Sequence, residues 1–217
     1  MTEQRPIQPT PVGALRFNTD SAKLEYFDGN QYVNITTDSP EQNTGGTRGI
    51  FYSGNLPSTN VIQFVNIATT GDAENFGDAV QIGRVAGCFS SRTRCFKANG
   101  YADGGTGGVN VIEFVTFSSQ GNATNFGDST ARRWNNNGFS DGTRGLSAGG
   151  EYPGTPFYDI IDYVTMSSEG DAIDFGDMVA ANQPGQNSAL ESPTRGVIAG
   201  GQESGTTYVQ HIQYVTM

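Results

Sequence analysis

The sequence is poor in charge, in histidine and cysteine, and in long apolar runs. Of its 217 residues 16% are charged, two are cysteines and one is a histidine. Two cysteines and one histidine are too few for a closed Cys/His zinc site. No run approaches the roughly 20 apolar residues of a membrane-spanning helix, and the first stretch, MTEQRPIQPTPVG, lacks the apolar core of a signal peptide. We therefore expect no zinc site, membrane insertion or secretory signal.

The charge balance argues against nucleic acid as a partner. The net charge is -10, the isoelectric point is about 4.4, and no Lys/Arg cluster offers a basic surface. Disorder is equally disfavoured, because the chain holds 13 Phe and 9 Tyr. The single His211 stands in an alternating segment without an oriented acid and nucleophile. We therefore expect no enzymatic activity, no catalytic residue and no cofactor.

An internal repeat of about 50 residues fills most of the chain. The dipeptide Thr-Arg opens TRGIFYSGN, TRCFKANG, TRGLSAGG and TRGVIAGG, whose arginines lie 46 to 51 residues apart. Two further elements keep this period: NVIQFVNI, NVIEFVTF, DIIDYVTM and HIQYVTM, and then GDAENFGD, GNATNFGD and GDAIDFGD. The fourth copy reaches Met217 before its third element. Three elements with one period predict a repeat architecture.

Each repeat is expected to contain four short β-strands. In the second element, apolar residues alternate with Gln63, Glu113 and Asp162, which is the pattern of a half-exposed strand. Gly-Gly after the first element and Gly-Asp or Gly-Asn before the third predict turns. A weaker strand precedes each Thr-Arg, in GRVAGCFSS, NNNGFSD and GQNSALES. No helical periodicity competes, so we predict an all-β fold.

Four strands in each repeat predict the blade of a β-propeller. The order SALES, TRGVIAGG and HIQYVTM resembles the kelch repeat, with an inner strand, a strand ending in Gly-Gly and a strand rich in Val and Tyr. Phe76, Phe126 and Phe175 stand where kelch repeats place a late tryptophan. The Tyr and Trp residues of the kelch signature are replaced, and Cys95 departs from the Thr-Arg-Gly rule. The resemblance implies a kelch-like propeller of about four blades.

Three parts are predicted along the chain. Residues 1–12 form an extended Pro-rich arm, residues 13–46 hold strand-like ALRFNTD, KLEYFDG and QYVNIT with a linker, and residues 47–217 hold the repeats. The repeats span residues 47–92, 93–142, 143–193 and, in part, 194–217. Because a propeller must protect its edges, one hypothesis has an N-terminal strand complete the last blade and close a four-bladed ring. The alternatives are that the four blades form an open arc, or that the N-terminal strands make a separate module that trimerises, as one form of homo-oligomer, or docks on a partner.

The N-terminal run resembles the segment that opens many bacteriophage virion proteins, especially tail-fibre-like proteins of phages that infect marine cyanobacteria. The matching residues are Gly13 and those at 16–20 and 23–29, in GALRFNTD and KLEYFDG. The linker TTDSPEQNTGGTRG and the repeats are similar to the same proteins, so the resemblance covers most of the chain. It implies a virion structural component, made in the host bacterial cytoplasm and located on the particle surface, with no enzymatic activity.

The leading hypothesis for function is a tail-fibre or appendage component. Residues 1–46 would dock on other virion proteins by strand addition, and the propeller would be displayed for attachment to the host surface by many weak contacts. One alternative is a capsid-decorating protein. Another is a lectin that binds host-surface glycans through the loops after the Gly-Gly turns, which are residues 56–58, 102–108, 151–157 and 202–207.

Three positions recur in the repeats and are expected to be structural. An arginine would bind carbonyls or an Asp between blades with its planar fork, the alternative being a basic ring that grips an anionic sugar. The Asp of each Phe-Gly-Asp would cap a turn or pair with an arginine, the alternative being Ca²⁺ binding with help from neighbouring acids. Asn122 and Thr124 replace two of those acids, which disfavours the metal. The residues concerned are Arg48, Arg94, Arg144 and Arg195; Phe76, Phe126 and Phe175; and Asp78, Asp128 and Asp177, with Asp72, Glu74, Asp171 and Asp174 beside them.

Two smaller features complete the candidates. Trp134 follows Arg132 and Arg133 in the chain's only basic and aromatic cluster, and with Tyr101 and Tyr152 it is a candidate for stacking on a sugar. Its alternative is a structural tryptophan between blades. Cys88 and Cys95 lie on neighbouring predicted strands, where a disulfide is sterically conceivable. The reducing cytosol disfavours a disulfide, so two buried thiols are expected.

Overall fold

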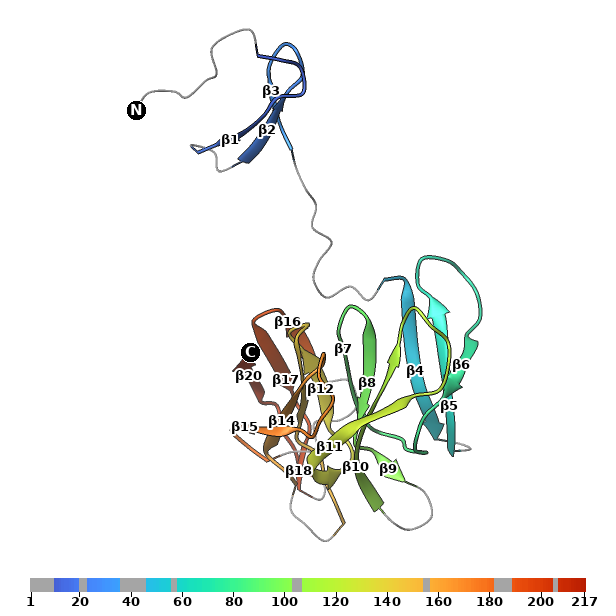
Figure 1. Cartoon of the computed structure of the whole chain (residues 1–217). Coiled ribbons are helices and arrows are strands. Elements are labelled where there is room, and N and C mark those ends of the chain that lie inside the picture. Colours follow the sequence, from blue (N-terminus) through green and yellow to red (C-terminus); the bar gives the residue numbers. More distant parts are fainter. Residues whose placement is uncertain are drawn as a thin grey trace. The chain divides into compact units, whose positions relative to one another are not determined.

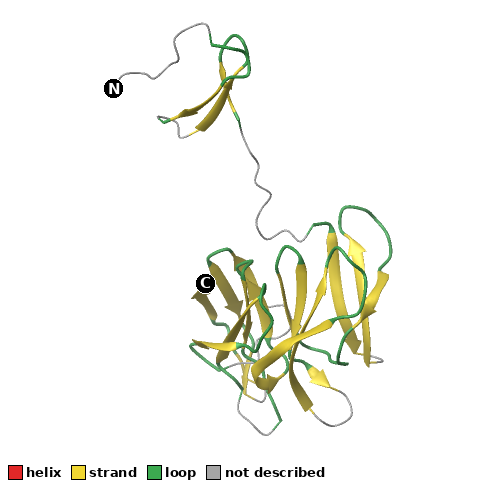
Figure 2. Cartoon of the chain, in the orientation of Figure 1, coloured by secondary structure: helices red, strands yellow, loops and turns green. Residues whose placement is uncertain are grey.

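The computed structural model describes residues 10–19, 23–35, 46–55, 58–102, 107–153, 157–181, 189–204 and 207–217. The chain divides into two compact units, Met1–Pro40 and Glu41–Met217. Every regular element of the described residues is a β-strand (Figure 2). The all-β prediction is therefore confirmed. The described part of the chain contains no helix long and apolar enough to span a membrane.

The N-terminal unit is a small antiparallel sheet. Its strands β1 (Leu15–Asn18), β2 (Lys23–Phe27) and β3 (Tyr32–Asn34) are hydrogen-bonded in the order β1-β2-β3. Phe27 is buried, with its ring centroid 5.3 Å from that of Tyr32. Glu25 accepts hydrogen bonds from Arg16 Nε at 2.7 Å and Asn18 Nδ2 at 2.9 Å. In the described pairings these three strands bond only to one another. The ring-closure hypothesis required one of them to join the fourth repeat, and no described pairing shows this. Residues 1–9 of the predicted arm lie outside the described residues.

The second unit contains four antiparallel sheets, one around each Thr-Arg element, which we call the first to fourth repeat sheets; the second to fourth each begin with the strand before that Thr-Arg. The first is β4 (Arg48–Asn55), β5 (Ser58–Asn66) and β6 (Glu74–Asp78). The second is β7 (Gly87–Ser90), β8 (Arg94–Ala98), β10 (Gly107–Thr116) and β11 (Thr124–Arg133), with β9 (Tyr101–Ala102) paired to β10. The third is β12 (Asn137–Ser140), β13 (Arg144–Ala148), β14 (Ile160–Thr165) and β15 (Ile173–Asp177). The fourth is β16 (Ala189–Ser192), β17 (Arg195–Ala199) and β20 (Ile212–Thr216), beside a hairpin of β18 (Gln202–Ser204) and β19 (Thr207–Tyr208).

The repeat sheets follow one another in chain order across the unit (Figure 1). The first strands of three of them, β7, β12 and β16, lie side by side. Among the described residues, the first repeat sheet has no counterpart of these strands, and the fourth has no counterpart of β6, β11 and β15. No strand pairing in the described part of the chain joins the first sheet to the fourth, so hydrogen bonds do not close the sheets into a barrel.

The core lies between successive repeat sheets. Each sheet has a forward face, which points toward the next sheet along the chain, and a backward face, which points toward the preceding one. Between the second and third sheets, Phe96, Ile112 and Phe114 of the forward face pack with Val164 and Met166 of the backward face. Equivalent apolar clusters lie at the other two junctions. Stacked sheets with apolar side chains on both faces explain how a sequence with only 35% hydrophobic residues builds a core.

Candidate functional site

Three aromatic side chains singled out in the sequence meet at one place, although they come from two different repeats. Trp134 follows β11, Tyr101 lies in β9, and Tyr152 follows the Gly-Gly turn of the third repeat. The Trp134 ring lies 5.0 Å from Tyr101, edge to face, and 5.9 Å from Tyr152, measured between centroids. All three side chains are half-buried, so part of each ring remains open to solvent. We call these three residues the aromatic site.

Backbone bridges hold the aromatic site in place. Trp134 and Glu151 exchange two backbone hydrogen bonds of 3.0 Å, and Arg84 and Tyr101 exchange bonds of 3.1 and 2.8 Å. Each loop is thereby tied to a neighbouring segment, which fixes the direction of its aromatic side chain. Of the loops predicted to form a specificity surface, residues 56–57, 103–106, 154–156 and 205–206 lie outside the described residues.

Charged and polar groups border the rings. The carboxylate of Glu151 accepts hydrogen bonds from Trp134 Nε1 at 2.8 Å and Asn135 Nδ2 at 2.9 Å. The guanidinium of Arg84 lies over the Tyr101 ring, 4.8 Å from its centroid. Arg84, Val85, Tyr101, Trp134 and Asn135 line a cavity of about 330 Å³. Flat aromatic surface beside a few oriented polar groups is the arrangement of a small-ligand site.

The basic residues next to Trp134 in sequence do not join this site in the way the sequence suggested. Arg133 is fully buried and forms an ion pair with Asp162, while its Nη2 also donates to the Ser147 carbonyl at 3.1 Å. Burial lowers the pKa of Arg133, and the Asp162 carboxylate opposes that shift. Arg132 is exposed. The cation beside the rings is instead Arg84, which sequence adjacency did not indicate.

Asp162 belongs to a set of polar side chains that the sequence placed on half-exposed strands. Gln63 of β5 is exposed as predicted, but Glu113 and Asp162 are buried, so the prediction is wrong for the second and third repeats. The reason is that a preceding sheet covers the backward face at these two positions. The carboxylates are satisfied there, since Glu113 pairs with Lys97 at 3.1 Å and accepts from Gln81 N at 3.2 Å. Asp162 likewise accepts from Thr130 N at 3.0 Å.

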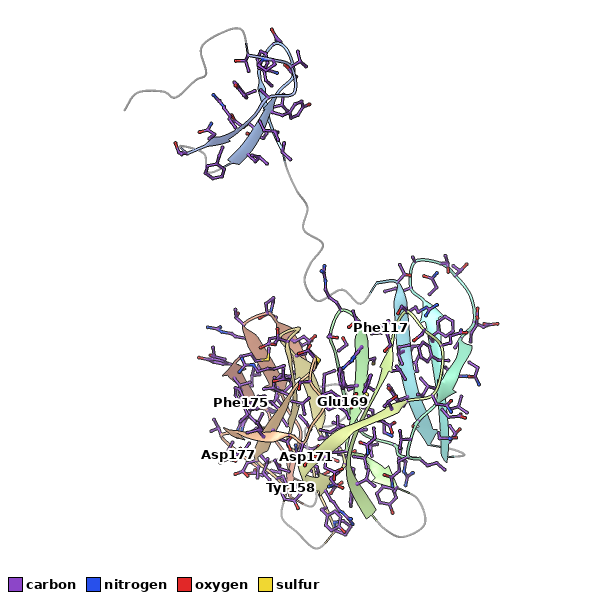
Figure 3. The ribbon with its side chains drawn as sticks, in the orientation of Figure 1. Phe117, Tyr158, Glu169, Asp171, Phe175 and Asp177 are labelled. Atoms are coloured by element: carbon purple, nitrogen blue, oxygen red, sulfur yellow. The ribbon has the colours of Figure 1, made fainter. Side chains whose placement is uncertain are left out.

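The four repeat arginines cover aromatic rings, and two of them also bridge neighbouring sheets. Arg48 donates to the Phe117 carbonyl, labelled in Figure 3, and Arg94 donates to the Met166 carbonyl at 3.2 Å. In both bonds the acceptor belongs to the next repeat. Arg144 instead donates to Asp141 at 3.1 Å. Each guanidinium also lies over an aromatic ring of its own repeat: Arg48 over Phe64, Arg94 over Phe114, Arg144 over Tyr163 and Phe175, and Arg195 over Tyr214, at 4.4 to 5.9 Å from the centroids.

The Phe-Gly-Asp triplets form a backbone latch between sheets. The carbonyls of Phe76 and Asp78 accept from the next repeat's Gly121 N and Ala123 N, both at 2.8 Å. A Cβ at Gly77 would overlap the Gly121 carbonyl, so this close approach requires glycine. The rings of the triplets pack edge to face on the preceding strand, at 5.8 to 5.9 Å, in the pairs Phe64–Phe76, Phe114–Phe126 and Tyr163–Phe175.

The latch recurs at the next junction, where Asp171 takes the place of Asn122 as the side-chain acceptor. Phe126 and Asp128 carbonyls accept from Gly170 N at 2.9 Å and Ala172 N at 2.8 Å. At these two junctions the triplet aspartates also contribute backbone N–H donors. Asp78 N donates to Asn122 Oδ1 at 3.0 Å, and Asp128 N donates to Asp171 Oδ1 at 2.9 Å; Asp171 and Asp177 are labelled in Figure 3. Among the described residues, no three His, Cys, Asp or Glu side chains gather as metal ligands.

Cysteine and histidine lie away from the aromatic site. Cys88 and Cys95 are both free thiols. Cys95 is buried, and burial raises the pKa of its thiol, whereas Cys88 is exposed where it lines a cavity, which corrects the expectation of two buried thiols. Cys88 lies opposite Lys97 and Cys95 opposite Ser90 in the β7–β8 pairing. His211 is exposed and lies directly before β20.

The cavity beside Cys88 is a second concave feature. It measures about 580 Å³, and residues of all four repeat sheets line it, among them Arg48, Lys97, Asn136 and Glu191. Lys97 and Arg48 are already held by Glu113 and the Phe117 carbonyl. Partial burial raises the pKa of Glu191. The backbone N–H of Ser140 donates to the Glu191 carboxylate and opposes this shift. The Arg48, Lys97 and Glu191 side chains of this cavity already bond other protein groups, so the aromatic site is the better candidate for a ligand.

No protein-family model matches the chain, and no curated protein sequence matches it either. The functional argument therefore rests on the geometry of the aromatic site and on the sequence of the N-terminal unit.

Proposed function

We propose that the chain is a non-enzymatic attachment protein of a bacteriophage particle and that its repeat unit binds glycan at the aromatic site. The observation that carries the glycan part is the convergence of Tyr101, Trp134 and Tyr152 beside Glu151 and Arg84. The N-terminal run GALRFNTD and KLEYFDG supports the virion part by its resemblance to phage proteins.

Sugar recognition follows from the chemistry of these groups. A pyranose ring presents axial C–H groups on one face, and these pack on an aromatic face with little desolvation cost. Its hydroxyls need both donors and acceptors, which Asn135, Glu151 and Arg84 supply at the rim. A single shallow site of this kind binds weakly, so attachment to a cell relies on many copies acting together.

The architecture of this proposal is a kelch-like array of about four propeller blades. It is supported by the meander order of the strands within each repeat sheet and by the adjacent first strands β7, β12 and β16. The N-terminal unit would be the docking module, because it builds its own sheet and leaves the outer strands β1 and β3 with one free edge each in the described pairings.

Replacing Trp134 by alanine tests the glycan proposal. We expect the variant to lose binding to host lipopolysaccharide glycans by about tenfold or more, because the central ring and its hydrogen bond to Glu151 are removed. Tyr208→Ala is the matched control, since Tyr208 is an exposed aromatic of another repeat. The readout is a glycan array followed by titration calorimetry, with thermal unfolding measured in parallel.

Two outcomes would overturn the glycan proposal: wild-type protein that binds no glycan of the array, or Trp134→Ala protein that binds as tightly as wild type. The virion part has a separate test, which is gold labelling of intact particles with an antibody to the repeat unit. Label on fibres supports an appendage component. Label spread over the head would overturn that assignment in favour of a capsid-decorating protein.

A further inference from the structure

The two outermost faces of the repeat array are apolar and exposed. On the forward face of the fourth repeat sheet, Leu190, Ile212 and Tyr214 are 72, 76 and 60% exposed. On the backward face of the first repeat sheet, Phe51 and Ile67 are 56 and 68% exposed. Exposed apolar patches of this kind mark interaction surfaces.

Equivalent side chains are buried or half-buried elsewhere in the array; the half-buried ones are Phe117, Tyr163 and Met217. The positions of Ile212 in the first three repeats are Ile62, Ile112 and Ile161, which are at most 2% exposed. The positions of Leu190 are Phe89 and Phe139, also buried. On the backward side, Ile67 corresponds to Met166, which is 2% exposed. The exposed residues therefore occupy repeat positions that, in the other repeats, join one repeat sheet to the next.

The two faces also match in shape. The ring of Phe89 lies on Gly145 and the ring of Phe139 lies on Gly196, so closely that a Cβ at either glycine would overlap the ring. Gly49 is the equivalent position in the first repeat sheet. A Cβ there would meet only Val65 and Ile67, at 3.4 and 3.5 Å, so its surface is open. The chain thus carries an uncovered projecting residue, Leu190, at one end and an uncovered receiving glycine at the other.

We propose that the forward face of the fourth repeat sheet docks on the backward face of the first repeat sheet of a second copy of this chain. Both faces are exposed at once within one chain, so the chain does not bury them against each other. The docked pair would continue the junction that the structure forms three times internally. Since the two surfaces differ, the contact is head-to-tail, and it builds a ring or a filament of copies.

Aspartate substitutions on each face test the docking. Ile212→Asp removes the forward face and Ile67→Asp removes the backward face; Ile173→Asp is the matched control, at an exposed isoleucine of the third repeat sheet. We expect wild type and Ile173→Asp to associate with rising concentration in sedimentation velocity. Each face variant alone should associate about tenfold or more weakly, because a charge is buried without a partner.

Mixing the two face variants separates this contact from a symmetric one. Each retains one intact face, so an equimolar mixture should form a two-chain complex that grows no further. A wild-type chain that stays monomeric at every concentration, face variants that associate like wild type, or a mixture that forms no complex would each overturn the proposal. Circular dichroism melting of all four proteins shows that the exposed substitutions leave the fold intact.

Discussion

At the residue scale, the position after each repeat arginine shows how a neighbouring sheet limits the size of a side chain. Gly145 and Gly196 lie beneath the rings of Phe89 and Phe139. The second repeat has Cys95 at this position, which departs from the Thr-Arg-Gly rule. The first repeat sheet lacks a strand equivalent to β7 or β12 in the described residues, so no aromatic ring of that kind covers Cys95. A side chain is therefore tolerated where the ring is absent.

Alanine should destabilise the protein at Gly145 but not at the equivalent Gly49. Gly145→Ala is expected to lower the free energy of unfolding by about 1–3 kcal/mol, because the methyl group would overlap the Phe89 ring, which is itself stacked on Phe96 at 5.2 Å. Gly49→Ala is the control and should change stability by less than about 0.5 kcal/mol. Urea denaturation followed by Trp134 fluorescence measures both. Equal losses in the two variants would contradict the steric explanation.

At the element scale, the turns before three of the four repeat arginines are built in one way. Ser91, Asp141 and Ser192 each accept the backbone N–H groups of the second and third residues that follow, at 2.6 to 3.4 Å. These bonds fix the hairpins β7–β8, β12–β13 and β16–β17. Burial would raise the pKa of Asp141, yet the N–H groups of Arg144 and Thr143 and the Arg144 guanidinium outweigh it, so this pKa lies below its usual value of 3.8.

The pH dependence of this turn gives a prediction. A lowered pKa in the folded state means stability that is present above the unfolded-state pKa and is lost as pH falls through the folded one. Asp141→Ser keeps a hydroxyl acceptor, as the other two turns do, but cannot titrate. Its stability deficit relative to wild type should therefore shrink below about pH 4. Asp141→Ala should lower the free energy of unfolding by about 1 kcal/mol at pH 7, because two N–H groups are left without an acceptor. A deficit of Asp141→Ser that stays constant from pH 7 to pH 3, in thermal melts, would contradict this account.

The elements themselves were largely predictable, whereas their contacts were not. Period and turn residues located the strands of each repeat and of the N-terminal unit. Alternation along one strand cannot show that a second sheet covers its polar side, which is why Glu113 and Asp162 were misplaced. The sequence indicates Tyr101, Trp134 and Tyr152 one by one, but only the bridges between loops bring the three together. The sequence shows a Ser or Asp three residues before Arg94, Arg144 and Arg195, a pattern typical of such turns.

At the scale of the whole molecule, the two units are built independently. Every described strand pairing lies within one unit or the other, and the three N-terminal strands pair only among themselves. We expect removal of residues 1–40 to leave the melting temperature of the repeat unit unchanged within about 2 °C, since it loses no strand pairing. Differential scanning calorimetry of the full and shortened chains measures this. A large fall in melting temperature would show that the units stabilise each other.

The backbone latch has a consequence for how the length of such a chain changes over evolution. Both junctions that contain it use the same backbone groups, with Asn122 or Asp171 as interchangeable acceptors. A gene duplication or deletion of one in-register segment of about 50 residues would place the triplet of one repeat against an equivalent Gly-Asn or Gly-Asp turn. No compensating mutation at the seam would be required. Array length is thereby free to change by whole repeats, while an insertion within a latch segment would break the backbone bonds of its junction.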